Sequence, residues 1–169
     1  MRIKRLRSLE VALDWTPAQL PDLDGRTYVI TGGNGGLGLA TAALLANKGG
    51  RIVISARDSG KARVALDTLR KAAPGAEFDA VQLDLSEPAS VAEAIPAIRS
   101  KCKRIDALIN NAGVMQTPEI RTSEGFELQM ATNYFGHFRL NSGLYPLLEG
   151  SAGRIGLTPE AERARRKLG

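Results

Sequence analysis

The chain has 169 residues, of which 43% are hydrophobic and 24% are charged, with 23 Lys and Arg against 18 Asp and Glu. This length suits one domain, and the apolar share is large enough to bury a core, which excludes an intrinsically disordered chain. A single Cys and a single His exclude an intrachain disulfide and a zinc site, and the Cys usage indicates a reducing compartment, for which we expect the cytoplasm.

The excess positive charge lies at the two ends of the chain. Residues 1–7 carry a net charge of +4 and residues 160–167 a net charge of +2, so the part between them is close to neutral. Basic ends on a neutral body are typical of solvated tails, and we therefore expect no nucleic-acid partner. No run reaches the roughly 18 apolar residues that a membrane span requires, so we expect no membrane span.

Apolar runs of strand length alternate with segments of helical period through most of the chain. Strands are predicted at 26–31, 51–55, 78–83 and 105–109, and a fifth begins at 153–155. Helices are predicted at 37–48, 59–73 and 88–101, followed by a long helical stretch at 124–148 that can break near its start. This alternation indicates an α/β fold, in which a doubly wound parallel sheet of about five strands is covered by helices on both faces.

A glycine-rich turn, TGGNGGLG at 31–38, joins the first predicted strand to the first helix. Glycine permits positive φ and lets a diphosphate approach the backbone, and the start of the next helix favours negative charge. The run fits GxGxxG, TGxxGxxG and TGxxxGxG, so its spacing leaves the subfamily open. Its place between a strand and a helix favours a dinucleotide site over a merely flexible loop.

We divide the chain into three segments around this turn. Residues 21–157 are predicted to form a Rossmann-type, NAD(P)-binding domain. Residues 1–20 are predicted to be a basic, amphipathic extension that packs against the outside of the domain. Residues 158–169 are predicted to form a short basic helix, with Thr158 as its N-cap and Pro159 at its first position. This proline also stops the fifth strand, because it lacks the N–H that a central strand needs.

Three further motifs follow the glycine-rich turn in order. Asp84-Leu85 follows the third strand, NNAG at 110–113 follows the fourth, and Asn133 lies within TNYFGHF at 132–138. Together with TGGNGGLG, these motifs resemble the short-chain dehydrogenase/reductase family over about residues 20–155, and NNAG selects its TGxxxGxG branch. The phrases LINNAGVM and GFELQMATNYFGHF are most similar to the retinol-dehydrogenase-like members of that family.

The resemblance implies a nicotinamide nucleotide cofactor held by matching residues. These residues are Gly32, Asn34, Gly36, Leu37, Gly38, Asp84, Leu85, Asn111, Ala112 and Gly113. By this resemblance the three glycines of the turn contact the phosphates, Asp84 accepts a hydrogen bond from the adenine amino group, and 111–113 lie against the ribose. Two alternatives stay open, because Asp84 could cap the following helix and Asn110 could tie strands together.

Arg57 bears on the choice of cofactor. Enzymes of this fold that use NAD usually hold the ribose hydroxyls with an acidic residue that ends the second strand. Here that strand ends in Ser55-Ala56-Arg57, and a guanidinium suits a 2′-phosphate, so we expect NADP(H) to be favoured over NAD(H). The alternative is that Arg57 is solvated and that Asp58 turns back toward the ribose.

The resemblance stops at the family's catalytic residues. Asn133 matches the asparagine of the catalytic set, but the Tyr-x-x-x-Lys pair and the preceding Ser have no counterpart, since none of the three tyrosines is followed by Lys at the fourth position. Tyr134 and His137 lie close to Asn133 and could titrate, but we interpret both as packing residues. Only 14 residues follow Ile155, and we expect a chain truncated at its C-terminus relative to the family.

Two functions remain open. The first is an NADP(H)-dependent oxidoreductase acting on a small-molecule alcohol or carbonyl, whose cofactor-binding half is present and which is inactive alone. The second is a non-catalytic NADP(H)-binding or interaction protein. We also expect self-association through 124–148, whose apolar residues form too broad a set for one buried stripe. They are Leu128, Phe135, Phe138, Leu140, Leu144 and Leu147.

Overall fold

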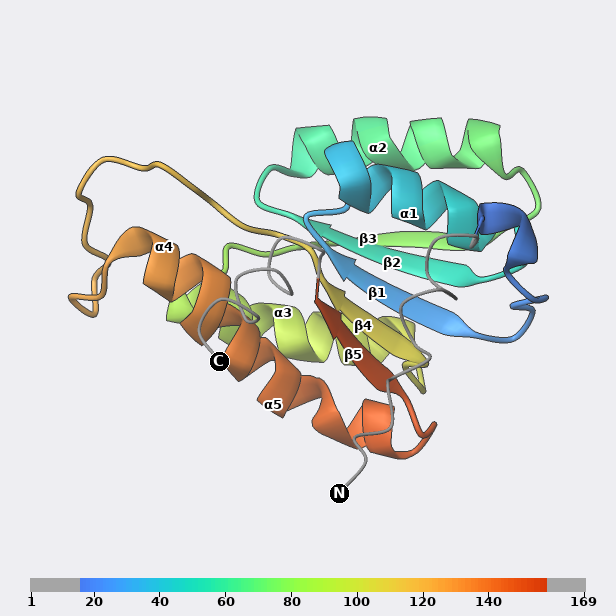
Figure 1. The fold of residues 1–169 in the computed structure, drawn as a ribbon. Coiled ribbons are helices and arrows are strands. Elements are labelled where there is room, and N and C mark those ends of the chain that lie inside the picture. Colours follow the sequence, from blue (N-terminus) through green and yellow to red (C-terminus); the bar gives the residue numbers. More distant parts are fainter. Residues whose placement is uncertain (1–15, 158–169) are drawn as a thin grey trace, which may run out of the picture.

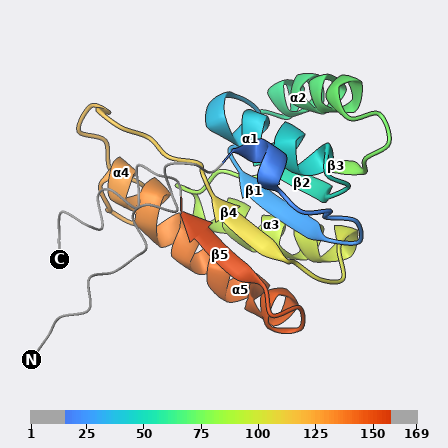
Figure 2. The same ribbon diagram turned by 45° about the vertical axis from the view of Figure 1, so that its right-hand side comes forward.

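A five-stranded parallel sheet with the strand order β3-β2-β1-β4-β5 forms the centre of the computed structural model, which describes residues 16–157. Helices cover both faces of this sheet (Figures 1 and 2), which confirms the predicted doubly wound architecture. The strands are β1 (Thr27–Thr31), β2 (Arg51–Ala56), β3 (Phe78–Gln82), β4 (Ala107–Asn110) and β5 (Arg154–Leu157). The helices are η1 (Pro17–Gln19), α1 (Gly36–Ala46), α2 (Ser59–Ala72), α3 (Pro88–Lys101), α4 (Leu128–Met130), η2 (Ala131–Gly136) and α5 (His137–Glu149).

The strands bury side chains on both of their faces, as expected for a parallel sheet. Val29 of β1 packs into the apolar layer beneath α3 and α5, whereas Ile30 packs into the layer beneath α1 and α2. Continuous apolar runs such as TYVIT and RIVIS therefore predicted these strands to within about two residues. On α5 the side chains that reach the sheet are spaced by one helical turn: Leu140, Leu144 and Leu148.

The predicted helical stretch at 124–148 is interrupted near its start, where the break was expected. The helix begins only at Leu128, because Gly125 has a positive φ of 82° and the Glu127 carboxylate caps the first turn by accepting the N–H groups of Gln129 and Met130. Residues 131–136 then form a π-helix, η2. A side chain at Gly136 would collide with the backbone carbonyl of Leu85, so this segment lies directly against the loop after β3.

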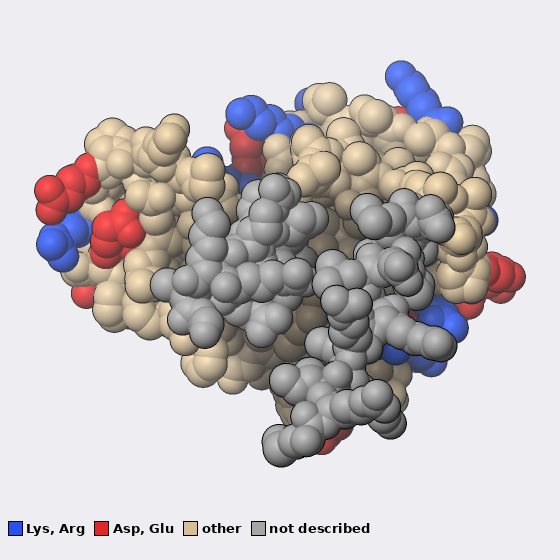
Figure 3. All heavy atoms as spheres, viewed as in Figure 1, with Lys and Arg blue, Asp and Glu red and all other residues tan. Residues whose placement is uncertain are grey.

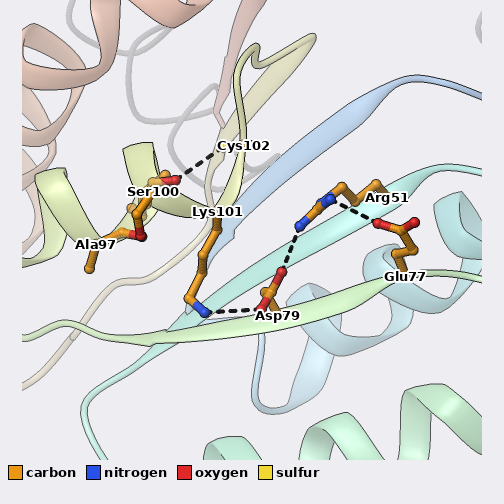
Figure 4. A network of polar contacts seen from close by, with 8 residues as sticks. Arg51, Glu77, Asp79, Ala97, Ser100, Lys101 and Cys102 are labelled. Carbon is orange, nitrogen blue, oxygen red and sulfur yellow. Dashed lines mark hydrogen bonds and ion pairs between the residues drawn. The ribbon is translucent and has the colours of Figure 1, made fainter.

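An ion-pair network joins β2, β3 and α3 (Figure 4). Arg51 contacts Glu77 and Asp79 at 2.8 Å each, and Lys101 Nζ lies 3.0 Å from the second oxygen of Asp79. Burial opposes ionisation of Asp79, but its hydrogen bonds from Lys101 and Arg51 prevail and hold the pKa of the carboxyl below its ordinary value. Cys102, which follows this network, is buried, and burial raises the pKa of its thiol.

The predicted N-terminal extension and C-terminal helix fall mostly outside the described residues. Of the extension at 1–20, the structure describes the last five residues, in which Pro17–Gln19 form a single 3-10 turn, and the predicted helix at 158–169 lies beyond the described part. On the face shown in Figure 3, basic and acidic side chains lie intermixed toward the margins. Within residues 16–157, no helix has both the length and the apolar character needed to cross a membrane.

Candidate cofactor site

The glycine-rich turn lies at the carboxyl end of β1, where the chain enters α1. From β1 the chain adds β2 and β3 on one side of the sheet and then β4 and β5 on the other. Ligands of open α/β sheets bind where the strand order changes direction in this way. Gly32 has a φ of 64°, and a Cβ there would lie 3.0 Å from the Cα of Ala112. At Gly38 a Cβ would lie 2.5 Å from Asn111 Nδ2, so these two glycines let the turn and α1 pack closely against the NNAG segment.

The first turn of α1 presents backbone N–H groups without a side-chain cap. Gly35 occupies the N-cap position and has no side chain to accept them. Cβ atoms built at Gly35 and Gly36 would meet nothing within 4 Å, and Leu37 beside them is exposed. Open space over uncapped N–H groups at the start of an eleven-residue helix fits the diphosphate of a dinucleotide.

A cleft of about 300 Å³ opens beside this turn, between the ends of β1, β2, β3 and β4. Seven residues predicted from the sequence line it: Gly32, Asn34, Arg57, Leu85, Asn111, Ala112 and Gly113. The predicted Gly36, Leu37 and Gly38 lie at the adjoining start of α1 instead. The structure therefore brings segments from four loops to one place, as the resemblance implied.

Asp84 does not line the cleft, although the neighbouring Leu85 does. Its Oδ1 accepts hydrogen bonds from the backbone N–H of Ser86 at 2.9 Å and from the Ser86 hydroxyl at 2.6 Å. The backbone N–H of Asp84 donates to Ser90 Oγ in the first turn of α3. These contacts organise the entry into α3, which is close to the capping role that the sequence left open, although Glu87 is the N-cap residue itself.

The NNAG segment is bound to the end of β1 through Asn111. Its Nδ2 donates to the carbonyl oxygens of Thr31 at 2.9 Å and Gly32 at 3.2 Å. The Thr31 hydroxyl accepts the N–H groups of Asn111 at 2.9 Å and Ala112 at 3.0 Å. The strand tie that the sequence suggested for Asn110 is therefore made by its neighbour, while Asn110 is buried and its Oδ1 finds no partner among the described residues.

Asn133 lies in η2 and holds the loop that follows NNAG. Its Oδ1 accepts the N–H of Val114 at 2.9 Å, and its Nδ2 donates to the carbonyl of the same residue at 2.8 Å. This paired contact fixes Gly113 and Val114, both of which line the cleft. The structure thus places Asn133 at the margin of the cleft, in contact with the predicted cofactor segment.

His137 contacts Thr31 and Asn133 and does not itself line the cleft. It is buried, its Nε2 lies 3.0 Å from Thr31 Oγ1, and its Nδ1 lies 3.2 Å from the carbonyl oxygen of Asn133. Burial lowers the pKa of His137, and the hydrogen bond to Asn133 offsets this only in part. The interpretation as a plain packing residue was therefore incomplete; its one signal in the sequence is its place one helical turn after Asn133.

Arg57 is exposed at the end of β2, at the edge of the cleft. Its backbone carbonyl accepts a hydrogen bond from Gln82 Nε2 at 3.1 Å, which fixes the start of the following loop. Asp58 Oδ1 instead accepts the N–H of Lys61 at 2.8 Å and caps α2. If Asp58 turned toward a ribose instead, its bond to the Lys61 N–H would break and α2 would lose its N-cap.

Known proteins share this arrangement. The family model described as short chain dehydrogenase matches residues 26–157. The short chain dehydrogenase/reductase dpchH of Colletotrichum higginsianum is 40% identical over 146 residues, which make up 85% of this chain and 36% of that protein. Human retinol dehydrogenase 13 is 39% identical over 130 residues, or 77% of this chain and 39% of that protein.

Solved structures agree with these relatives. A short-chain dehydrogenase from Sphingobium yanoikuyae superposes with a TM-score of 0.66 at 32% identity, over 78% of this chain and 52% of that one. The curated relatives are longer, and the chain spans 36% to 45% of the length of the first five that it matches. The match over residues 26–157 takes in the glycine-rich turn, NNAG and Asn133, and this chain belongs to the short-chain dehydrogenase/reductase family.

Proposed function

We propose that this chain binds NADP(H) and forms the cofactor-binding part of an oxidoreductase that acts on an alcohol or carbonyl compound. When bound, such a cofactor exchanges a hydride with the substrate. The observation that carries the proposal is the convergence of uncapped N–H groups, a guanidinium and the NNAG backbone on one cleft. The Sphingobium yanoikuyae relative, which was solved in complex with NADPH, supports the choice of ligand.

Each part of the cofactor has a matching group in the cleft. The diphosphate would lie on the N–H groups at the start of α1, the 2′-phosphate near Arg57, and the adenosine between Leu85 and the 111–113 segment. Asn133 would act by holding the Val114 loop in place. Within residues 16–157, no group of three or more metal-ligating side chains gathers, and the proposal includes no metal ion.

Calorimetric titration with NADP+ tests this proposal. Gly35→Glu places a carboxylate in open space over the start of α1, at a backbone φ of −172° that any residue adopts, so the fold is retained. Repulsion between this carboxylate and the diphosphate should abolish measurable binding. Gly75→Glu is the matched control, because a Cβ there also meets nothing within 4 Å and Gly75 lies outside the cleft. Equal binding by both variants would refute the proposed site.

A non-catalytic NADP(H)-binding or interaction protein is the second candidate function. It is favoured by the sequence itself, in which no Tyr is followed by Lys at the fourth position. Under either proposal, we expect the 169-residue chain to bind the cofactor without turning over a substrate, because proton transfer would lack a positioned acid or base. We also retain the cytoplasm as the proposed location.

We further propose that the chain associates with itself through the outer side of η2 and α5. The residues that reach the sheet occupy one side of α5, whereas large apolar side chains remain exposed on another. They are Met130, Tyr134, Phe138 and Tyr145, which recur at intervals of one or two helical turns. An exposed apolar strip of this kind is typical of a contact surface between proteins.

A further inference from the structure

We propose that His137 is a positioning residue for the cofactor site: its neutral imidazole accepts the Thr31 hydroxyl proton and so holds the NNAG segment against the glycine-rich turn. This inference rests on the proposed NADP(H) site. It goes beyond that proposal because it makes the affinity of the site for NADP(H) depend on the protonation state of one residue. Thr31 and His137 are 106 residues apart in the chain and meet at the junction of β1 with α5.

The argument starts from the hydrogen-bonding capacity of the Thr31 hydroxyl, which has two lone pairs and one proton. Both lone pairs are used, because Oγ1 accepts the N–H groups of Asn111 at 2.9 Å and Ala112 at 3.0 Å. The proton must therefore go to an acceptor. His137 Nε2 lies at 3.0 Å and the carbonyl oxygen of Ile109 at 3.4 Å, so the imidazole is the better partner.

This assignment fixes the tautomer of His137. If Nε2 accepts from Thr31, the ring proton resides on Nδ1, and Nδ1 lies 3.2 Å from the carbonyl oxygen of Asn133. That carbonyl is available because the backbone N–H of His137 bonds to the carbonyl of Tyr134 instead. The π-helical turn and the Nδ1–H tautomer therefore support each other, and the same Asn133 holds Val114 through its side chain.

Protonation of His137 would reverse one of these bonds. A charged imidazole carries a proton on both nitrogens, so Nε2 would point a donor at Thr31 Oγ1. The hydroxyl could accept it only by releasing Asn111 or Ala112, both of which line the proposed cofactor cleft. Low pH should therefore loosen the NNAG segment from the turn and weaken cofactor binding.

The surroundings of the imidazole offer it no compensating negative charge. Burial lowers the pKa of His137, and the hydrogen bond to the Asn133 carbonyl offsets this only in part. The charged residues on the segments packed around it are engaged elsewhere. Asp84 accepts from Ser86, Glu127 caps α4, and Arg139 pairs with Glu124 at 2.8 Å.

The first test measures the tautomer and the pKa of the His137 imidazole directly by NMR, without a ligand. His137 is the single histidine of the chain, so an untagged, ¹⁵N-labelled sample gives one set of imidazole signals. Two-bond ¹H–¹⁵N correlation spectra at neutral pH should show the neutral Nδ1–H tautomer, and titration should give a pKa below the ordinary histidine value of about 6.5. An Nε2–H tautomer, or a pKa at or above the ordinary value, would overturn the proposal.

The second test measures NADP+ affinity by calorimetry from pH 8 down to one pH unit below the histidine pKa that the spectra give. His137→Gln supplies an acceptor that cannot be protonated, and His137→Phe supplies none. Wild type should lose about three- to tenfold in affinity relative to His137→Gln as the pH falls, which corresponds to one neutral hydrogen bond. The 2′-phosphate of the ligand also titrates near pH 6, but it does so with both proteins, so their ratio isolates the histidine.

Two further comparisons complete the test. His137→Phe should bind NADP+ about three- to tenfold more weakly than His137→Gln even at pH 8. If His137→Phe does not fold, Thr31→Val removes the hydroxyl from the β1 side and should lose at least as much affinity, because the N–H groups of Asn111 and Ala112 lose their acceptor as well, whereas Thr31→Ser should restore binding. Parallel pH profiles for wild type and His137→Gln would refute the proposal. A wild-type chain that binds no NADP+ at any pH would refute the proposed function, while the histidine spectrum would still decide the tautomer.

Discussion

Replacement of Arg57 by alanine should weaken NADP+ binding and leave NAD+ binding unchanged. The guanidinium stands at the edge of the cleft, and Asp58, the acid beside it, is committed to the cap of α2. Asp58 does not line the cleft, so Arg57 is the charged side chain that the β2–α2 turn presents to it. NAD+ lacks this phosphate, so the two ligands separate the charged contact from every other effect of the substitution.

The exposure of Arg57 sets the size of the effect. A unit charge pair about 4 Å apart contributes about 1 kcal/mol in water, and a doubly charged phosphate at most about twice that before salt screening. Hydrogen bonds to charged groups contribute up to about 3 kcal/mol, but an exposed side chain falls toward the lower end of that range. We therefore expect a loss of about 1–2 kcal/mol, or roughly five- to thirtyfold in the dissociation constant.

Calorimetric titration of wild type and Arg57→Ala with NADP+ and NAD+ at two salt concentrations provides the measurement. Arg63→Ala is the matched control, because Arg63 is exposed on α2 and does not line the cleft. The NADP+ advantage of wild type should shrink at high salt and vanish in Arg57→Ala. Equal losses for both ligands would show that Arg57 supports the fold of the loop and does not recognise the 2′-phosphate.

The remaining predictions concern turnover, association and acid stability. We expect no substrate-dependent loss of NADPH absorbance when the chain is incubated with NADPH and a panel of aldehydes, ketones and retinoids. Activity that disappears in Tyr134→Phe would contradict the interpretation of Tyr134 as a packing residue. Phe138→Glu should shift sedimentation toward the monomer, and an unchanged distribution would exclude this helix surface as the contact. Asp79→Asn should lower the free energy of unfolding by about 1 kcal/mol at pH 7. Because the pKa of Asp79 is depressed in the folded chain, this difference should persist above pH 4 and disappear as the pH falls below it, as measured by urea unfolding.

The sequence predicted those parts of the fold that depend on local pattern. Apolar strands buried on both faces, helices stopped by glycine, and a glycine-rich turn between β1 and α1 all leave a signature within a few residues. The cleft could be predicted as well, because the carboxyl ends of parallel strands meet at one edge, and this brought Arg57 and Asn111 together. Seven of the thirteen residues that line the cleft were among those named from the sequence.

The contacts that fix the site could not be predicted in the same way. The bond between Thr31 and His137 joins residues 106 positions apart, and no local pattern distinguishes a buried histidine that accepts a proton from one that only fills space. The π-helix at 131–136 leaves no signature either, because its residues suit an ordinary helix and Gly136 meets Leu85 only in the folded chain. The contacts of Asp84 with Ser86 and Ser90 could not be predicted either, because no local pattern distinguishes them from the adenine contact that the resemblance implies.

The π-helical turn makes the number of residues between Glu127 and His137 as important as their identity. A π-helical turn holds about one residue more than an ordinary helix, so if residues 131–136 became an ordinary helix with no residue lost, everything after them would rotate by about 100°. Leu140, Leu144 and Leu148 would then leave the sheet, and the imidazole would no longer face β1. Deletion of one residue within 131–136 should restore an ordinary helix and keep this register, whereas deletion of one residue between His137 and Leu140 should lose it, so deletion scanning would locate the π-helical turn in the chain without a structure.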